Sequence, residues 1–168
     1  MARQTIDMES KAIMNLSVLL DDDFADTVEL IYISKGRVII TGIGKSAIIA
    51  TKIVATLNST GTPSVFMHAA DAIHGDLGLI LEDDVVICIS KSGNTPEIKV
   101  LVPLIKNAKN KMVAITGNKD SYLGQQADYV LNTYVEKEAC PNNLAPTTST
   151  TAQLVIGDAL AVFLLELR

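Results

Sequence analysis

The segment that decides the fold is VVICISKSGNTPE, which runs from Val85 to Glu97. Its first five residues are apolar and mostly β-branched, which predicts a buried strand at Val85–Ile89. A hydroxyl-rich turn follows, and Pro96 stands where the next helix should begin. A helix start leaves backbone N–H groups unpaired and carries partial positive charge, so it can bind an anion. The segment therefore predicts a strand, a turn and a helix around a phosphate, and a phosphorylated small molecule as the ligand.

The rest of the chain alternates helical and strand patterns. Two helical stretches, at about Ile6–Leu20 and Phe24–Ser34, come before the first strand. Strands are then predicted at Val38–Thr41, Ser64–Met67, Val85–Ile89, Met112–Thr116 and Tyr129–Asn132. Helices are predicted at Lys45–Asn58, Thr95–Lys109, Ser121–Gln126 and Ser149–Leu167. Residues 68–79 fit either a helix or a loop. This order is typical of an α/β fold with a five-stranded parallel sheet and helices on both faces, as in flavodoxin-like and Rossmann-like three-layer folds.

Length and composition predict one domain. The chain has 168 residues, of which 48% are hydrophobic, enough for one core but too few residues for two full domains and a linker. We expect an N-terminal helical segment at about 1–34 and an α/β core at about 36–168. The net charge of -5 and the lack of a Lys and Arg cluster argue against a nucleic-acid partner.

The compartment and the metal content are predicted from the cysteines and the apolar runs. Cys88 and Cys140 lie far apart, without the spacing of a metal site or of a secreted disulfide framework. The chain opens without a basic-then-apolar leader and contains no run of about 18 uncharged apolar residues. We therefore expect a cytoplasmic protein with no membrane contact and no metal requirement.

Three segments rich in glycine or hydroxyl groups fall where ligands bind in an open parallel sheet, at the carboxyl ends of the strands. They are Gly42–Ser46, Ser90–Thr95 and Thr147–Thr150. Helix capping would explain any one of them alone, but all three together favour a ligand. The candidates for phosphate binding are Gly44, Ser46, Ser90, Ser92, Gly93, Asn94, Thr95, Thr147, Thr148 and Ser149.

The glycine turn admits two other interpretations. Gly44-Lys45-Ser46 resembles the end of a Walker A loop, but Ile39 stands where that motif needs its first glycine, which excludes this route to ATP binding. Gly42 to Ala47 also fits the looser dinucleotide pattern. The next strand, however, ends at Met67-His68 with no carboxylate for a ribose diol. NAD binding therefore stays as a weaker alternative.

Motifs from about Gly36 to Leu165 resemble the sugar isomerase (SIS) domain and, within it, the arabinose-5-phosphate isomerases. The Ser-x-Ser-Gly loop at residues 90–93 marks the superfamily, whereas HGDLG at 74–78 and EACP at 138–141 point to this isomerase. The other matching segments are TGIGKS at 41–46, STGTPS at 59–64 and LAPTTSTT at 144–151. The resemblance implies interconversion of D-arabinose 5-phosphate and D-ribulose 5-phosphate, which supplies Kdo, an eight-carbon acid of lipopolysaccharide or capsule. It also implies a homotetramer with shared sites.

The chemistry of that reaction can be compared with the residues present. Aldose–ketose isomerisation moves a proton between adjacent carbons through an enediol, so it needs a base and a donor near the oxygens, but no redox cofactor. Glu97 and Glu138 are candidates for the proton shuttle if burial raises their pKa. Lys45 is a candidate for stabilising negative charge or binding the phosphate, and His74 for opening the sugar ring or donating to an oxygen, in its own or a neighbouring subunit.

The resemblance places the family's functional residues on these four positions. Each also has a structural explanation: a carboxylate that favours the helix dipole, a solvated lysine, or a histidine with satisfied hydrogen bonds. Members of this family usually continue into a His-Pro-Gly-Gly segment and often into paired CBS domains, and residues 1–168 contain neither. Two interpretations stay open. The sequence is a piece of a longer isomerase, or it is a weak isomerase or a non-catalytic sensor of a sugar phosphate or of CMP-Kdo.

Overall fold

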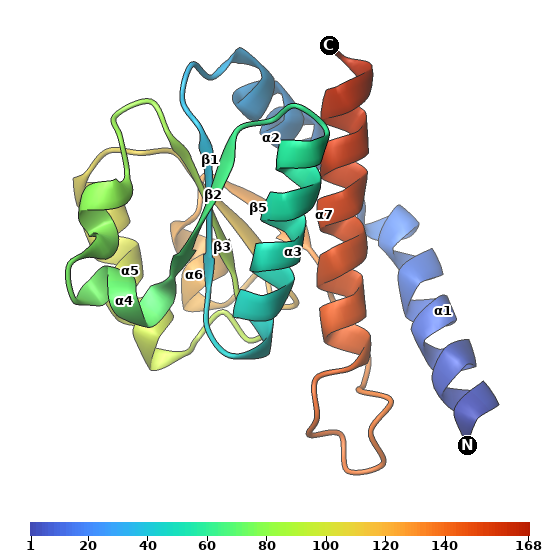
Figure 1. Cartoon of the computed structure of the whole chain (residues 1–168). Coiled ribbons are helices and arrows are strands. Elements are labelled where there is room, and N and C mark those ends of the chain that lie inside the picture. Colours follow the sequence, from blue (N-terminus) through green and yellow to red (C-terminus); the bar gives the residue numbers. More distant parts are fainter.

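Five parallel strands form one sheet in the computed structural model, which describes residues 1–168 (Figure 1). The strand order is β2-β1-β3-β4-β5, so β1 and β3 lie side by side near the middle and β2 and β5 form the edges. The strands are β1 Val38–Gly42, β2 Ser64–His68, β3 Val85–Ile89, β4 Met112–Thr116 and β5 Tyr129–Asn132. The predicted parallel sheet is confirmed, and β3, β4 and β5 have the predicted bounds.

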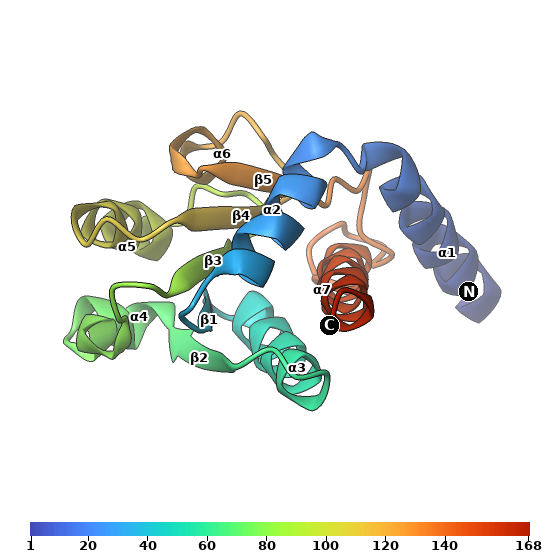
Figure 2. The same ribbon diagram turned by 90° about the horizontal axis from the view of Figure 1, so that it is seen from above.

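Helices cover both faces of this sheet (Figure 2). The first face carries α2 Asp22–Ile33, α3 Lys45–Ser59 and α7 Thr148–Glu166. The opposite face carries α4 Ala69–Ile73, α5 Pro96–Asn107 and α6 Tyr122–Gln126. Because side chains alternate along a strand, Ile40 and Ile87 enter the first core, whereas Ile39 and Val86 enter the second. Buried β-branched residues on both faces are the reason why these strands read as continuous apolar runs.

Of residues 68–79, which the sequence left open, His68 ends β2 and residues 69–79 form two short elements. Helix α4 ends at Ile73, and a 3₁₀ turn, η1, covers Asp76–Leu79. Gly75 separates them with a φ of 140°, a backbone conformation that favours glycine. His74 lies in this break.

Helix α1, Ala2–Leu19, extends from the body of the molecule (Figures 1 and 2). It begins at Ala2, whereas the sequence predicted a start at about Ile6. Only Leu16 of this helix is buried, and it packs with Val135 and Ala152. Helix α1 therefore rests on α7 at one end and leaves most of its surface uncovered by the rest of the chain.

Helix α7 packs closely against α3. A Cβ atom on Gly157 would come within 2.4 Å of the Ile53 side chain, so this glycine allows the two helices to approach each other. By length and composition α7 is the one helix that could cross a membrane, but half of its apolar window is buried inside the fold, as in a core helix. The starts of α3 and α7 both lie at the carboxyl edge of the sheet (Figure 1).

Candidate functional site

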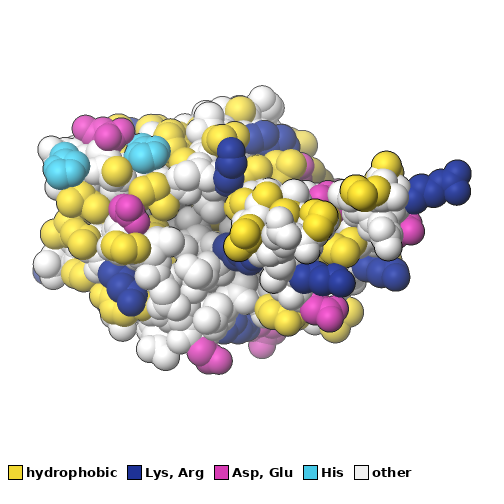
Figure 3. Space-filling model, turned by 90° about the horizontal axis from the view of Figure 1, so that it is seen from below, with side chains coloured by type: hydrophobic (Ala, Val, Ile, Leu, Met, Phe, Trp, Pro, Cys, Tyr) yellow, Lys and Arg dark blue, Asp and Glu magenta, His cyan; other side chains and the backbone are white.

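A cavity of about 260 Å³ opens at the carboxyl edge of the sheet. Figure 3 shows the molecule from this side, with the histidine side chains away from its centre. The lining residues are Ile43, Lys45 and Ser46 from the first loop, Ile89, Ser90, Lys91, Ser92 and Thr95 from the second, and Pro146, Ser149, Thr150 and Gln153 from the third. The three segments that the sequence singled out therefore meet at one cavity.

The loop between β3 and α5 is folded by its own hydroxyl groups. The amide of Gly93 donates to Ser90 Oγ at 3.1 Å, and the amide of Asn94 donates to Ser92 Oγ at 3.2 Å. Gly93 has a φ of 64°, and a Cβ atom there would lie 2.0 Å from Ser121 Oγ. This position therefore requires glycine.

Thr95 offers an unpaired hydroxyl to the cavity. It is the N-cap residue of α5, yet its side chain makes no capping hydrogen bond. Its Oγ1 is buried and has no hydrogen-bond partner in the protein. A buried polar atom without a partner costs free energy unless a ligand or water satisfies it. Together with the starts of α3, α5 and α7, this hydroxyl makes the cavity suitable for an anion.

Five of the predicted phosphate-binding residues do not line the cavity, and four of them have structural roles at its edge. Gly44 is the N-cap of α3 and has a φ of 60°, so it shapes the turn. Gly93 and Asn94 shape the next loop, because Asn94 Oδ1 accepts a hydrogen bond from the Tyr122 amide at 3.0 Å. Thr147 binds Glu138 and also stays outside.

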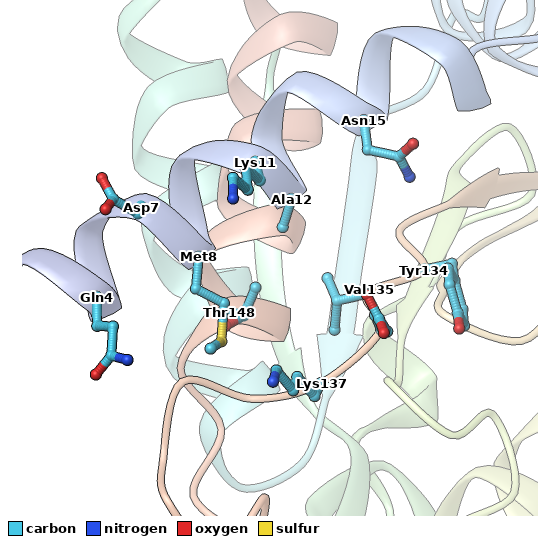
Figure 4. Close-up of a pocket in the computed structure, with 11 residues that line it drawn as sticks. Gln4, Asp7, Met8, Lys11, Ala12, Asn15, Tyr134, Val135, Lys137 and Thr148 are labelled. Carbon is cyan, nitrogen blue, oxygen red and sulfur yellow. The ribbon is translucent and has the colours of Figure 1, made fainter.

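Thr148 was predicted to bind the phosphate together with Ser149, but the two residues do not face the same cavity. Thr148 lines a separate cleft of about 830 Å³ between α1 and residues 134–137, which Figure 4 shows in close-up. Successive residues at a helix start point in different directions, so a run of four hydroxyls cannot all face one ligand. This larger cleft does not include the β3–α5 loop, because none of its lining residues comes from residues 90–97.

Glu138 is the centre of a buried polar network. Its Oε1 accepts from Lys91 Nζ at 2.6 Å and from Ser149 Oγ at 2.5 Å. Its Oε2 accepts from the amides of Thr147 at 2.9 Å and Ser149 at 3.1 Å. The side chain is fully buried, at 0% exposure. This carboxylate therefore fixes the first turn of α7 and one lysine of the β3–α5 loop.

The expectation that burial raises the pKa of Glu138 is wrong for this structure. Burial does act in that direction, but the hydrogen bonds from Lys91 and Ser149 and from the amides of Thr147 and Ser149 outweigh it and lower the pKa to about 2. Hydrogen bonds to the charged form favour ionisation, and five donors converge on this carboxylate, including the Thr147 hydroxyl at 3.3 Å. Glu138 is thus a stable anion and does not line the cavity.

The other three candidate catalytic residues differ in how close they lie to the cavity. Lys45 lines it and is exposed. Glu97 is partly buried in the first turn of α5, two residues after Thr95. His74 is exposed at the end of α4 and does not line the cavity. The structure thus brings Lys45 to the cavity and Glu97 near it, but not His74 of the same chain.

Lys91 and Gln153 also line the cavity, and neither was predicted. Gln153 accepts a hydrogen bond from Ser46 Oγ at 3.3 Å, which links α7 to α3. Lys91 had a signal, since it is the cation inside the hydroxyl loop. Gln153 had no such signal in the sequence beyond its place one turn after Ser149.

No three of the His, Cys, Asp and Glu side chains lie close enough to hold a metal ion.

Comparison with known proteins identifies the family of this chain. Residues 31–163 match the SIS domain. The chain belongs to the SIS domain family. Its SIS domain is 40% identical to an Escherichia coli CFT073 protein solved in complex with arabinose 5-phosphate, with a TM-score of 0.95, covering 99% of this chain and 88% of that one.

Two curated relatives carry the same SIS domain within longer chains. The arabinose 5-phosphate isomerase KdsD of Pseudomonas aeruginosa is 51% identical over 99% of this chain and 51% of its own length. The arabinose 5-phosphate isomerase KpsF of Escherichia coli O6:H1 is 52% identical over 99% of this chain and 51% of its own length. The chain thus spans about half the length of the curated relatives it matches.

Proposed function

We propose that this SIS domain interconverts D-arabinose 5-phosphate and D-ribulose 5-phosphate through an enediol, and that it supplies the aldose for Kdo synthesis. The observation that carries the proposal is the meeting of three helix starts and the unpaired Thr95 hydroxyl at one cavity. It is supported by the E. coli protein solved with arabinose 5-phosphate, whose SIS fold this chain matches over nearly its full length.

The phosphoryl group is the part of the substrate that the cavity fits best. Thr95, Ser92 and Ser46 present hydroxyls to it, and the α3 and α5 starts contribute partial positive charge. Binding energy from this non-reacting group holds C1 and C2 in place for the proton transfer. The sugar carbons then extend from the phosphate toward Lys45 and the first turn of α5.

Proton transfer is assigned to Glu97 in this proposal. Of the two candidate carboxylates, Glu138 is fully buried and accepts hydrogen bonds from five donors, whereas Glu97 forms no ion pair. Lys45 stabilises negative charge on the enediolate oxygen. No redox cofactor is needed, since the proton moves within one molecule.

A homotetramer with shared sites is part of the proposal, and it gives His74 a role. This histidine does not line the cavity of its own chain, so it would act at a neighbouring subunit's cavity. The outer face of α7 is apolar and open, with Val162 51% exposed, and Ile48 on the adjacent α3 is 63% exposed. Apolar surface of this kind is typical of subunit interfaces.

Both cysteines are free, which fits the reducing cytoplasm as the proposed compartment.

The test is an isomerase assay on a panel of pentose and hexose phosphates. The 168-residue chain and a version extended to the length of its curated relatives are each incubated with D-arabinose 5-phosphate, and ketose formation is followed. We expect conversion without added nucleotide or metal. Binding of arabinose 5-phosphate by both folded proteins without conversion would overturn the isomerase and favour a sugar-phosphate or CMP-Kdo sensor. Absorbance change that requires NAD would favour the dinucleotide alternative.

A further inference from the structure

Lys91 lies between the cavity and the buried carboxylate of Glu138. It is the second residue of the hydroxyl loop and lines the cavity beside Ser90 and Ser92. Its Nζ is 2.6 Å from Glu138 Oε1. The lysine side chain is 47% exposed, whereas that of Glu138 is 0% exposed. The ion pair therefore joins a fully buried carboxylate to a half-exposed lysine that lines the cavity.

The two side chains of this pair differ in their unused hydrogen-bonding capacity. Both oxygens of Glu138 are occupied, by Lys91 and Ser149 on one side and by the α7 amides on the other. An ammonium group has three N–H donors, and Lys91 uses one of them, on Glu138. The remaining two are available to an anion in the cavity.

We propose that Lys91 is a substrate-contacting residue that binds the phosphoryl group, and that Glu138 is a positioning residue that holds Lys91 from behind. The proposal rests on the proposed function, whose substrate is a sugar phosphate. A lysine side chain loses much conformational freedom when it binds a ligand, and an anchored one has lost part of it beforehand. Because Glu138 also binds the α7 amides, the same carboxylate aligns Lys91 with the hydroxyl of Ser149.

The test compares substrate binding with turnover in four variants. Dissociation constants for inorganic phosphate and arabinose 5-phosphate, together with KM and kcat, are measured for Lys91→Met, Lys91→Arg, Glu138→Gln and the double variant Lys91→Met/Glu138→Gln. We expect Lys91→Met to raise KM and both dissociation constants about ten- to a hundredfold, with kcat changed by less than about threefold. Lys91→Arg should recover part of the loss.

Non-additivity identifies the positioning role of Glu138. If Glu138 acts through Lys91, Glu138→Gln weakens phosphate binding in the wild-type background but adds little to Lys91→Met. Lys106→Met is the matched control, because it removes one positive charge at the far end of α5, where the lysine contacts Gln126. Its binding constants should equal those of the wild type.

Two results would overturn the inference. One is phosphate binding by Lys91→Met that matches the wild type. The other is a Glu138→Gln variant that loses turnover while KM stays unchanged, which would make Glu138 the proton shuttle. If Glu138→Gln does not fold, the Lys91 variants still test phosphate binding, because the Lys91 side chain is half exposed and its replacement should leave the fold intact. Failure of the proposed function would look different: the wild type would bind phosphate, with Lys91 contributing, but would not convert the sugar.

Discussion

A single residue, Glu138, should make the stability of the fold depend on pH. Burial acts to raise its pKa, but Lys91, Ser149 and two backbone amides lower it from 4.5 to about 2 in the folded chain. A lowered pKa contributes stability that is complete above the unfolded value, near pH 4.5, and is lost as the pH falls toward 2. We predict that Glu138→Gln costs about 2 kcal/mol or more at pH 7, because it leaves the donors around it poorly satisfied.

Urea unfolding of the wild type and of Glu138→Gln between pH 7 and pH 2.5 measures this effect. The gap between their free energies of unfolding should be constant from pH 7 to about 5 and should narrow below that. A gap that keeps its full size at pH 2.5 would contradict the assignment. Glu136→Gln, an exposed neighbour, is the control and should show little gap at any pH.

The sequence predicted the site residues unevenly, for physical reasons. The sequence could single out Ser92, Thr95 and Lys45, because a hydroxyl or a cation near a helix start indicates anion binding from the local pattern alone. The pairing of Lys91 with Glu138 joins residues 47 positions apart, and such a contact depends on the tertiary fold rather than on local pattern. The lowered pKa of Glu138 was missed for the same reason, since burial was foreseeable but its donors were not.

The β3–α5 loop is the element whose shape depends on one glycine. Gly93 has a φ of 64°, and an added Cβ would lie 2.0 Å from Ser121 Oγ and 3.1 Å from Thr116 Oγ1. We predict that Gly93→Ala lowers the stability by about 2 kcal/mol and weakens phosphate binding at least tenfold, because Ser92 and Thr95 shift with the loop. Thermal unfolding measures the change in stability, and titration calorimetry measures phosphate binding. Gly78→Ala, with open space around it, should change neither, and equal behaviour of the two variants would contradict this account.

The contact between α3 and α7 is a second prediction at the element scale. Alanine in place of glycine normally stabilises a helix by about 1 kcal/mol. At Gly157 the added Cβ would come within 2.4 Å of Ile53, so Gly157→Ala should instead destabilise the chain by about 1 kcal/mol or more. Combining it with Ile53→Ala should cost less than the sum of the two single changes in denaturant unfolding. Full additivity would show that the two helices do not depend on this close contact.

Most elements could be predicted because their signals are local. The strands Met112–Thr116 and Tyr129–Asn132 are short apolar runs with polar or turn residues beyond them, and their bounds agree with the structure. Residues 68–79 could not be assigned, because their structure is a five-residue helix and a 3₁₀ turn, each too short to establish a period. The start of α1 was missed because polar residues fill its first turn.

The proposed tetramer would form through the open apolar face of α7 and α3. Val162 is 51% exposed and Ile48 is 63% exposed. We predict that the double variant Ile48→Glu/Val162→Glu is folded but smaller than the wild type in light scattering, where the wild type should have four times the 18.0 kDa mass of one chain. Val100→Glu, on α5 at the opposite face, should leave the mass unchanged. A monomeric wild type would contradict the proposed tetramer.

In the proposed function, the molecule as a whole holds one dianion where three helices start at the edge of a parallel sheet. A crystal structure of the chain with arabinose 5-phosphate tests this claim most directly. The account predicts the phosphorus atom in the 260 Å³ cavity, with phosphoryl oxygens within hydrogen-bond distance of Ser92 and Thr95. A phosphoryl group bound instead in the 830 Å³ cleft beneath α1, with the Thr95 hydroxyl still unpaired, would contradict it.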